Sequence, residues 1–194
     1  MSNARAFGRA VFRQSVIALT WVPVVIFVEN NIFSVASIEG ISMKPTFNPE
    51  SNRLRRDWVL ENKWFWWTGP EGEPLFHRGD VVTLRSPMTT RMATKRVVAV
   101  AGDIISTRPP RAGRVVTVPE GHVWVEGDEQ FHSSDSNDYG PVAINLIESK
   151  ISTIIWPLSR FGEVSKEGGR DPRISKRQMN TEGNAGDWAE YGYH

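Results

Sequence analysis

The residues best suited to chemistry in this sequence are Ser42, within the stretch GISMKPT, and Lys95, which opens an apolar run. A serine hydroxyl is a poor nucleophile unless a neighbouring base takes its proton. The histidines form no recognisable Ser-His-Asp signature, and the chain has no G-x-S-x-G elbow. A lysine carried into the protein by an apolar strand would have a lowered pKa, because burial disfavours the ammonium form. Lys95 is therefore the favoured base for Ser42.

The next residue, Arg96, should point to the opposite face of the same strand, where it could form a structural ion pair.

The composition excludes several other kinds of functional site. The 194 residues contain no cysteine, which excludes disulfides, thiolate metal sites and cysteine nucleophiles. The four histidines lack metal-ligand spacing, so no metal or nucleotide cofactor is implied. The net charge of +1 gives no overall field for binding nucleic acid.

The N-terminus predicts a membrane anchor. Residues 1–14 contain three arginines and no acid, and residues 14–28 carry no charge. This layout also occurs in cleaved signal sequences, and an apolar run of this length can be a buried core helix. A single transmembrane helix over residues 15–34 fits the basic start best, with the arginines on the side given by the positive-inside rule.

The remainder of the chain predicts a mostly β fold. Short runs rich in β-branched residues alternate with Gly and Pro turns, and helical periodicity is weak. Strands are expected at residues 81–84, 95–101, 115–118, 122–125, 144–147 and 150–155, with the third and fourth joined as a hairpin. We expect a catalytic β domain over residues 35–160. Residues 161–194 are polar and poor in aliphatic side chains, which predicts a disordered tail.

Over roughly residues 15–158 the chain resembles the type I signal peptidases, because four motifs occur in the family's order. The motifs are Ser42-Met43-x-Pro45-Thr46, Arg78-Gly79-Asp80-Val81-Val82, Lys95-Arg96-Val97 through Gly102-Asp103, and Gly127-Asp128 with Ser133, Asp135 and Ser136. These enzymes are membrane-anchored serine–lysine endopeptidases with a mostly β catalytic fold. The stretches TWVPV at residues 20–24 and GHVWVEGD at residues 121–128 are similar to the mitochondrial inner-membrane members, which remove sorting signals.

The resemblance implies a role for each matching residue. Ser42 corresponds to the nucleophile and Lys95 to the general base. The supporting positions are Ser133, whose hydroxyl orients the lysine, Asp128 and Arg96, which form an ion pair, and Asp135, a carboxylate behind the site.

The oxyanion of the intermediate would be held by the Ser42 backbone N–H. Bacterial members often add a serine hydroxyl two residues earlier, where this chain has Gly40, so the second donor is left open. Residues 129–132 read EQFH in place of the bacterial Asn-Arg-Asp-Asn, and no role is carried over to them.

The resemblance also implies a location and partners. The protein would cross the mitochondrial inner membrane once, with its N-terminus in the matrix and its catalytic domain in the intermembrane space. Its partners would be precursors with cleavable sorting signals, a homologous second protease subunit and the inner-membrane lipid, but no nucleic acid. The aromatic run at residues 64–67 would face the membrane surface or a partner.

Three alternatives are a bacterial-type or microsomal signal peptidase, a self-cleaving repressor-type peptidase and a non-catalytic assembly subunit. The repressor type needs a DNA-binding domain ahead of Ser42, where the chain has an apolar run instead. A non-catalytic subunit would have no reason to keep both Ser42 and Lys95.

Overall fold

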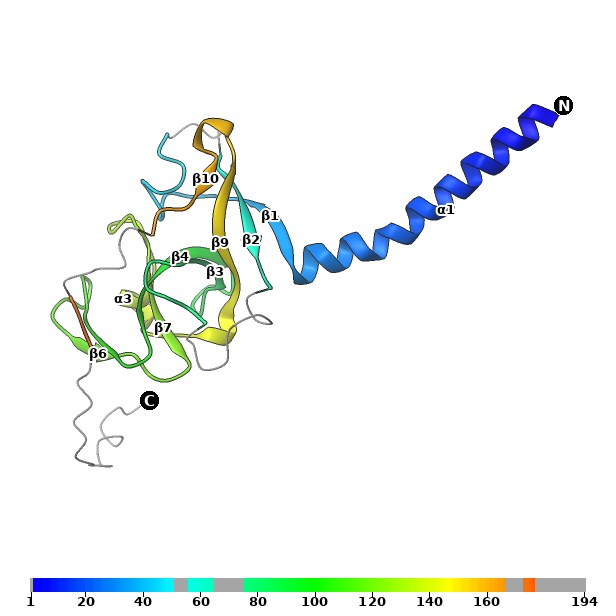
Figure 1. Cartoon of the computed structure of the whole chain (residues 1–194). Coiled ribbons are helices and arrows are strands. Elements are labelled where there is room, and N and C mark those ends of the chain that lie inside the picture. The colour runs from blue at the N-terminus through cyan, green and yellow to red at the C-terminus, as the bar shows by residue number, and fades with distance from the viewer. Residues whose placement is uncertain (1, 51–55, 65–74, 167–172, 177–194) are drawn as a thin grey trace.

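The computed structural model describes residues 2–50, 56–64, 75–166 and 173–176. One long helix, α1 (Ser2–Asn31), projects away from a β domain (Figure 1). Its segment Phe12–Asn31 is a 20-residue candidate membrane span with a mean hydropathy of 1.4, and none of it is buried in the protein. An apolar helix that its own domain leaves uncovered does not fit the alternative of a buried core helix.

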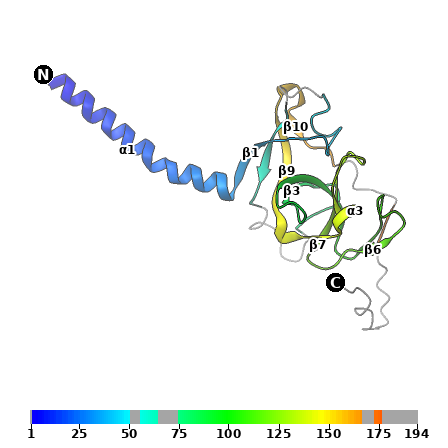
Figure 2. The same cartoon turned by 180° about the vertical axis from the view of Figure 1, so that it is seen from behind.

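The β domain confirms the prediction of a mostly β fold behind one apolar helix. Among the described residues, eight strands form one curved sheet in the order β1-β2-β9-β3-β4-β7-β8, with β10 paired to β9 (Figures 1 and 2). These strands are β1 (Phe33–Ser37), β2 (Trp58–Asn62), β3 (Val81–Arg85), β4 (Met92–Val100), β7 (His122–Glu126), β8 (Val142–Ala143), β9 (Ile147–Trp156) and β10 (Gly162–Glu163). All their pairings are antiparallel.

A smaller sheet packs beside the first, in the order β11-β5-β6. Its strands are β5 (Asp103–Ser106), β6 (Val115–Thr117) and β11 (Ile174–Lys176), and the short helices are α3 (Ser136–Tyr139), η2 (Ile144–Leu146) and η3 (Leu158–Arg160). Alternating side chains of β7 enter two apolar clusters. Val123 and Val125 pack with Val97 of β4, while Trp124 packs with Ile105 of β5. Strand β7 is therefore buried on both faces.

Two local predictions were wrong. The expected hairpin over residues 115–125 does not form, because β6 pairs with β5 and β7 pairs with β4. The expected strands 144–147 and 150–155 are a turn of 3-10 helix followed by the single strand β9. The strand continues through polar Ser149 because its backbone pairs with β3, and Ser149 is buried there.

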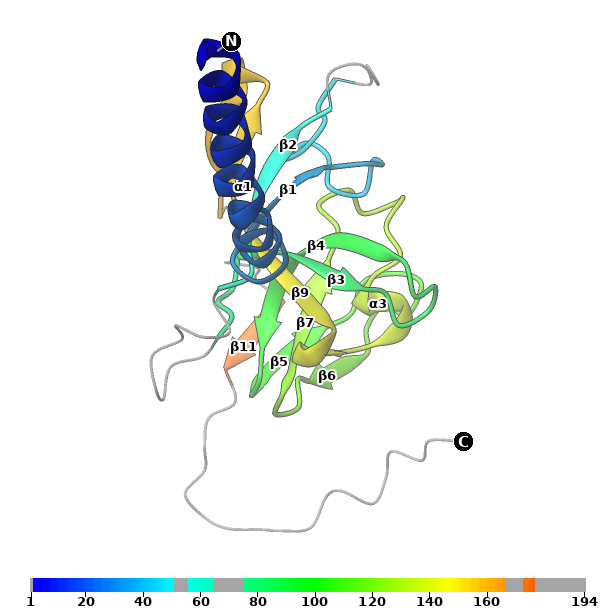
Figure 3. The same cartoon turned by 90° about the vertical axis from the view of Figure 1, so that its right-hand side faces the viewer.

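Regular structure also continues beyond residue 160, into the segment predicted as a tail. Strand β10 pairs with β9 (Figure 2), and β11 pairs with β5 (Figure 3). The paired backbones explain this difference, since a strand that supplies hydrogen bonds to a sheet edge needs few apolar side chains of its own. Three members of the predicted aromatic run, residues 65–67, lie outside the described residues.

Candidate active site

Ser42 begins a tight turn that connects β1 to the loop before β2. The two apolar residues that flank this turn, Met43 and Phe47, are 3% and 1% exposed and pack in the cluster that contains Val59 of β2. The Phe47 N–H donates to the Met43 carbonyl at 2.9 Å. Met43 therefore fixes the turn in the core while Ser42 stays partly exposed.

A buried ion pair holds the far end of the same loop, here called the nucleophile loop (residues 42–48). Asp57, which is 1% exposed, accepts the Asn48 N–H at 2.7 Å and pairs with Arg160. Arg160 also donates to the Thr46 carbonyl at 2.6 Å. Asn48 has a positive φ of 49°, which an asparagine tolerates better than most residues. The loop is thus tied to η3, more than one hundred residues later in the chain.

Lys95 lies on β4 and is only 4% exposed. Its Nζ donates a hydrogen bond to the Ser133 Oγ at 2.8 Å. Burial lowers the pKa of Lys95 below the ordinary lysine value, while the carboxylates of Asp135, Asp138 and Asp128 oppose this shift. Desolvation is the largest of these effects, so a neutral amine becomes accessible closer to physiological pH.

Ser133 is the hydroxyl that contacts Lys95. It also donates to the Asp135 Oδ2 at 2.8 Å. Its neighbours are engaged elsewhere, since Ser134 lies 3.8 Å from the sulfur of Met88 and Ser136 accepts the Val125 N–H at 3.0 Å. The structure therefore separates three serines that the sequence places too close together to distinguish.

The buried carboxylate of Asp135 accepts hydrogen bonds from several groups around Ser133. Its Oδ2 accepts the Gly127 N–H at 3.0 Å, and its Oδ1 accepts the backbone and side-chain N–H groups of Asn137, each at 3.0 Å. It also caps α3, in a capping box with Asp138. These bonds hold the carboxylate in place, so that its Oδ2 can fix the Ser133 hydroxyl.

Arg96 and Asp128 form the expected ion pair on the opposite face of β4. Two parallel hydrogen bonds of 2.8 Å join the guanidinium to the carboxylate. Thr46 bridges the pair, donating to Asp128 and accepting from Arg96 at 3.1 Å. The pair therefore also ties the nucleophile loop to β4 and to the segment after β7.

Gly127 brings the Ser42 turn against the lysine network. A Cβ at this position would collide with both the Ser42 carbonyl oxygen and the Ser133 side chain. The Ser42 carbonyl also accepts the Glu129 N–H at 3.0 Å. Gly127 therefore separates the Ser42 backbone from the Ser133 side chain, which binds the Lys95 amine, and only a glycine fits between them. A serine turn packed against the partner of a buried lysine is compatible with nucleophilic catalysis in which the lysine is the base.

Sequence reasoning missed several residues of this arrangement. Thr46 and Gly127 were recognised only as parts of motifs, although each makes a contact that joins two segments. Asn137 and Asp57 were given no role, and Arg160 was not singled out. Nothing in the residues next to them in the sequence identifies the partner of each.

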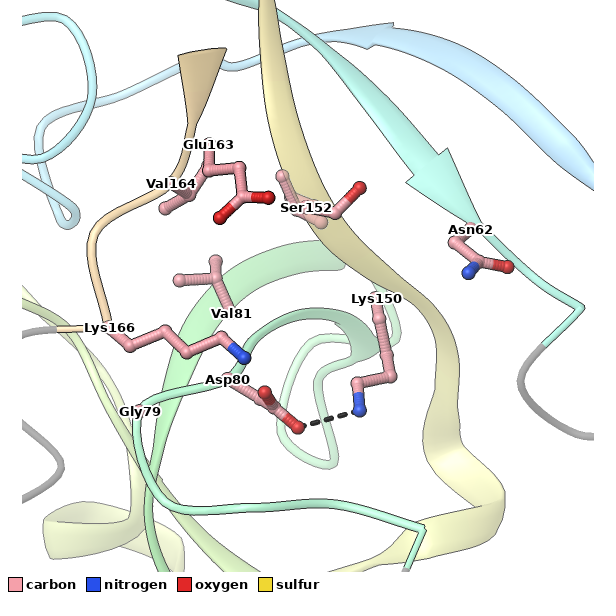
Figure 4. Close-up of a pocket in the computed structure, with 10 residues that line it drawn as sticks. Asn62, Gly79, Asp80, Val81, Lys150, Ser152, Glu163, Val164 and Lys166 are labelled. Carbon is pink, nitrogen blue, oxygen red and sulfur yellow. Dashed lines mark ion pairs between the residues drawn. The ribbon is translucent and has the colours of Figure 1, made fainter. Parts of the chain in front are cut away.

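A cavity of about 280 Å³ lies apart from Ser42 and Lys95, against β3 and β9. Asp80 and Lys150 face each other in it, with Nζ 2.7 Å from Oδ2, and Glu163 and Lys166 line the opposite side (Figure 4). Its charges are balanced, and it contains none of the predicted site residues.

Comparison with known proteins gives the family. Residues 10–115 match the family model of signal peptidase, peptidase S26. The chain is 51% identical over 164 residues to mitochondrial inner membrane protease subunit 2 of Schizosaccharomyces pombe, covering 84% of this chain and 87% of that protein. It is 41% identical over 174 residues to subunit 2 of Saccharomyces cerevisiae, covering 89% of this chain and 96% of that protein.

A subunit 1 protein is more distant. Mitochondrial inner membrane protease subunit 1 of Schizosaccharomyces pombe is 34% identical over 131 residues, covering 65% of this chain and 75% of that protein. The extent of these matches and the match to the family model lead to one conclusion: the chain belongs to the S26 family of signal peptidases.

Proposed function

We propose that this protein is a membrane-anchored serine endopeptidase of the mitochondrial inner membrane, which removes sorting signals with Ser42 as nucleophile and Lys95 as general base. The observation that carries the proposal is the buried Lys95 amine, bonded to Ser133 where the Ser42 turn meets Gly127. The names of the relatives support the compartment.

In the first step, neutral Lys95 takes the proton of the Ser42 hydroxyl as its oxygen attacks the scissile carbonyl. Lys95 donates an N–H to Ser133, so the lone pair of a neutral amine is left to accept this proton. Ser133 in turn donates to Asp135, which fixes its oxygen toward the lysine. The role of Ser133 is therefore to orient the amine, which increases the fraction of productive encounters.

In the second step, the Lys95 ammonium gives its proton to the leaving amine as the peptide bond breaks. The nearby carboxylate of Asp135 stabilises the transient ammonium. Water then attacks the acyl-enzyme, with Lys95 again as base, and releases Ser42.

The negative charge on the carbonyl oxygen would be stabilised by the Ser42 backbone N–H. The turn that carries this N–H is held on one side by Met43 in the core and on the other by the Glu129 N–H bond to the Ser42 carbonyl. A donor fixed before the substrate binds needs no reorganisation in the transition state.

We expect the membrane topology from the charge distribution along α1. Its basic N-terminal side would stay in the matrix by the positive-inside rule, so the β domain would face the intermembrane space. Precursors held in the same bilayer would present their sorting signals as extended chains near the membrane surface.

A homologous second protease subunit would be the partner of this chain. The similarity to both a subunit 2 and a subunit 1 protein supports this, because the two names indicate two related chains in one protease. The greater identity to subunit 2 favours that role for this chain.

The test is cleavage of a panel of mitochondrial intermembrane-space precursors by the purified full-length protein with its partner subunit. Ser42→Ala and Lys95→Met should each lower cleavage by about three orders of magnitude or more. Lys95→Arg should be equally inactive, because a guanidinium does not become neutral in proteins.

The matched control is Lys63→Met, which removes an amine that bonds the Glu29 carbonyl near the end of α1. It should cleave like the wild type. Full cleavage by both Ser42→Ala and Lys95→Met would instead favour a non-catalytic assembly subunit.

A further inference from the structure

The residues after η3 make contacts directly behind the active site. Residues 162–166 run from β10 past Gly79 and Asp80, as Figure 4 shows. Residues 173–176 consist of Arg173 and the strand β11 that follows it. We call residues 162–166 and 173–176 the C-terminal clamp. Their contacts reach Arg96 on β4, the strand that carries Lys95, and Glu126 at the end of β7, next to Gly127.

The first contact is made to β4. The Arg96 Nη1 donates to the Ser165 carbonyl at 2.7 Å and to the Gly79 carbonyl at 3.0 Å. Arg96 is 2% exposed and follows Lys95 directly, so its position helps to set that of Lys95. The Nε and Nη2 of Arg96 donate to Asp128, while its Nη1 donates to the two carbonyls, one of which belongs to the clamp.

The close approach of the clamp explains the glycine in the sequence Arg78-Gly79-Asp80. Gly79 has a φ of +92°, and a Cβ there would lie 2.7 Å from the Lys166 carbonyl oxygen. Both the backbone conformation and the lack of space exclude a side chain. The glycine of this motif is therefore required in part because the C-terminal clamp passes directly over it.

The second contact is made to β7. Glu126 is 3% exposed, and Arg173 donates to its two carboxylate oxygens at 3.2 and 2.9 Å. Arg108 and the Trp124 indole N–H complete its partners, at 3.0 and 2.9 Å. Glu126 pairs in register with Arg96 and precedes Gly127, which packs against Ser42 and Ser133.

We propose that the C-terminal clamp positions the active site, with Arg173 acting through Glu126 and Ser165 acting through Arg96. The clamp would hold the ends of β4 and β7 in register, so that Lys95 and Gly127 stay opposite the Ser42 turn. A buried carboxylate that loses one arginine shifts to recover solvation, and this shift moves the backbone at Gly127. The inference rests on the proposed function, since its effect is read as cleavage.

The test is a double-mutant cycle on Glu126 and Arg173 in the full-length protein with its partner subunit. The substrate is the precursor that the wild type cleaves fastest in the panel described above. Arg173→Gln should lower kcat about tenfold per folded molecule, with KM changed less than about twofold. Glu126→Gln should have a similar effect, and the double variant should be no worse than the worse single variant, because the two residues act as one unit.

Arg173→Lys keeps the charge without the two parallel hydrogen bonds, so it should recover part of the lost kcat and also remain well folded. Arg111→Gln, which removes an exposed arginine, is the matched control and should cleave like the wild type. The folded fraction is measured by size exclusion and resistance to trypsin, so that loss of protein is separated from loss of turnover.

An unchanged kcat per folded molecule in Arg173→Gln would overturn the proposal and leave the clamp a purely structural feature. Losses that multiply in the double variant would also overturn it, since Arg173 would then act independently of Glu126. A wild type whose cleavage does not depend on Ser42 would instead refute the proposed function.

Discussion

The charge state of Lys95 is decided by its immediate surroundings. Burial disfavours the ammonium and lowers the pKa, while Asp135, Asp138 and Asp128 favour the ammonium and limit the shift. This balance would serve both halves of the proposed reaction, in which the amine accepts a proton and then returns it. A more isolated lysine would be a weaker base, and a more closely paired one would stay protonated.

The pH dependence of cleavage follows from this balance. Only neutral Lys95 acts as a base, so kcat/KM should rise with pH through the pKa of Lys95, and this rise should lie below the ordinary lysine pKa. Asp135→Asn removes the carboxylate that raises this pKa most, so the rise should move to lower pH while kcat falls, since Ser133 loses its acceptor. The check is kcat/KM against pH for both proteins.

Glu148→Gln, which changes an exposed carboxylate paired with Arg85, is the control and should leave the profile in place. A profile in Asp135→Asn that moves to higher pH would contradict the assignment of Lys95 as the base.

Residue types and motif order were enough to select Ser42, Lys95, Ser133 and Asp135 from the sequence. The structure places the last three in one hydrogen-bonded chain. Thr46 could not be selected in this way, because its role depends on Arg96 and Asp128, which are distant in sequence.

At the scale of elements, the nucleophile loop has two supports. Apolar packing of Met43 and Phe47 holds its beginning, and the Asp57–Arg160 pair holds its end. The second support links β2, η3 and the loop, because Arg160 also reaches the Thr46 carbonyl. A substitution in η3 should therefore change the position of the nucleophile loop that contains Ser42.

Arg160→Gln should lower both stability and activity. It leaves the buried carboxylate of Asp57 without its charged partner, and we expect the free energy of unfolding to fall by about 2 kcal/mol. Arg56→Gln breaks an exposed pair with Glu39 and should cost less than about 0.5 kcal/mol. Denaturant unfolding of the purified proteins measures the free energy of unfolding of each variant. Equal decreases in the two variants would contradict the role of the buried pair.

Strand pairing shows where sequence reasoning ends. Residues 115–125 have two apolar runs around a Pro-Glu-Gly turn, which is typical of a hairpin. In the structure β7 instead pairs with β4, where its side chains enter core clusters on both faces. Local turn chemistry could not reveal this, because burial by distant strands decides the pairing.

At the scale of the whole molecule, α1 and the β domain have separate tasks. The helix is exposed along its apolar segment and contacts the domain where it leads into β1. The β domain carries the candidate active site, and the helix would hold this domain beside the bilayer. Strands β10 and β11 lie within the segment predicted as a disordered tail, because they gain stability from backbone pairing, which composition does not report.

Topology can be tested in isolated mitochondria whose outer membrane has been ruptured. An epitope before residue 2 should stay protected from added protease, while an epitope in the exposed turn at residues 111–113 should be digested. The positive-inside rule predicts this orientation from the arginines in the N-terminal part of α1. Digestion of the N-terminal epitope with protection of the other would contradict it.

The central claim is that Lys95 is a base whose pKa is lowered by burial. Its most direct test is NMR titration of the lysine side chains in ¹³C-labelled protein, with Lys95→Met used to identify the signal of Lys95. The account predicts a midpoint below the ordinary lysine value of about 10.4, coinciding with the rise of kcat/KM. A midpoint at or above that value, with cleavage already maximal at lower pH, would contradict it.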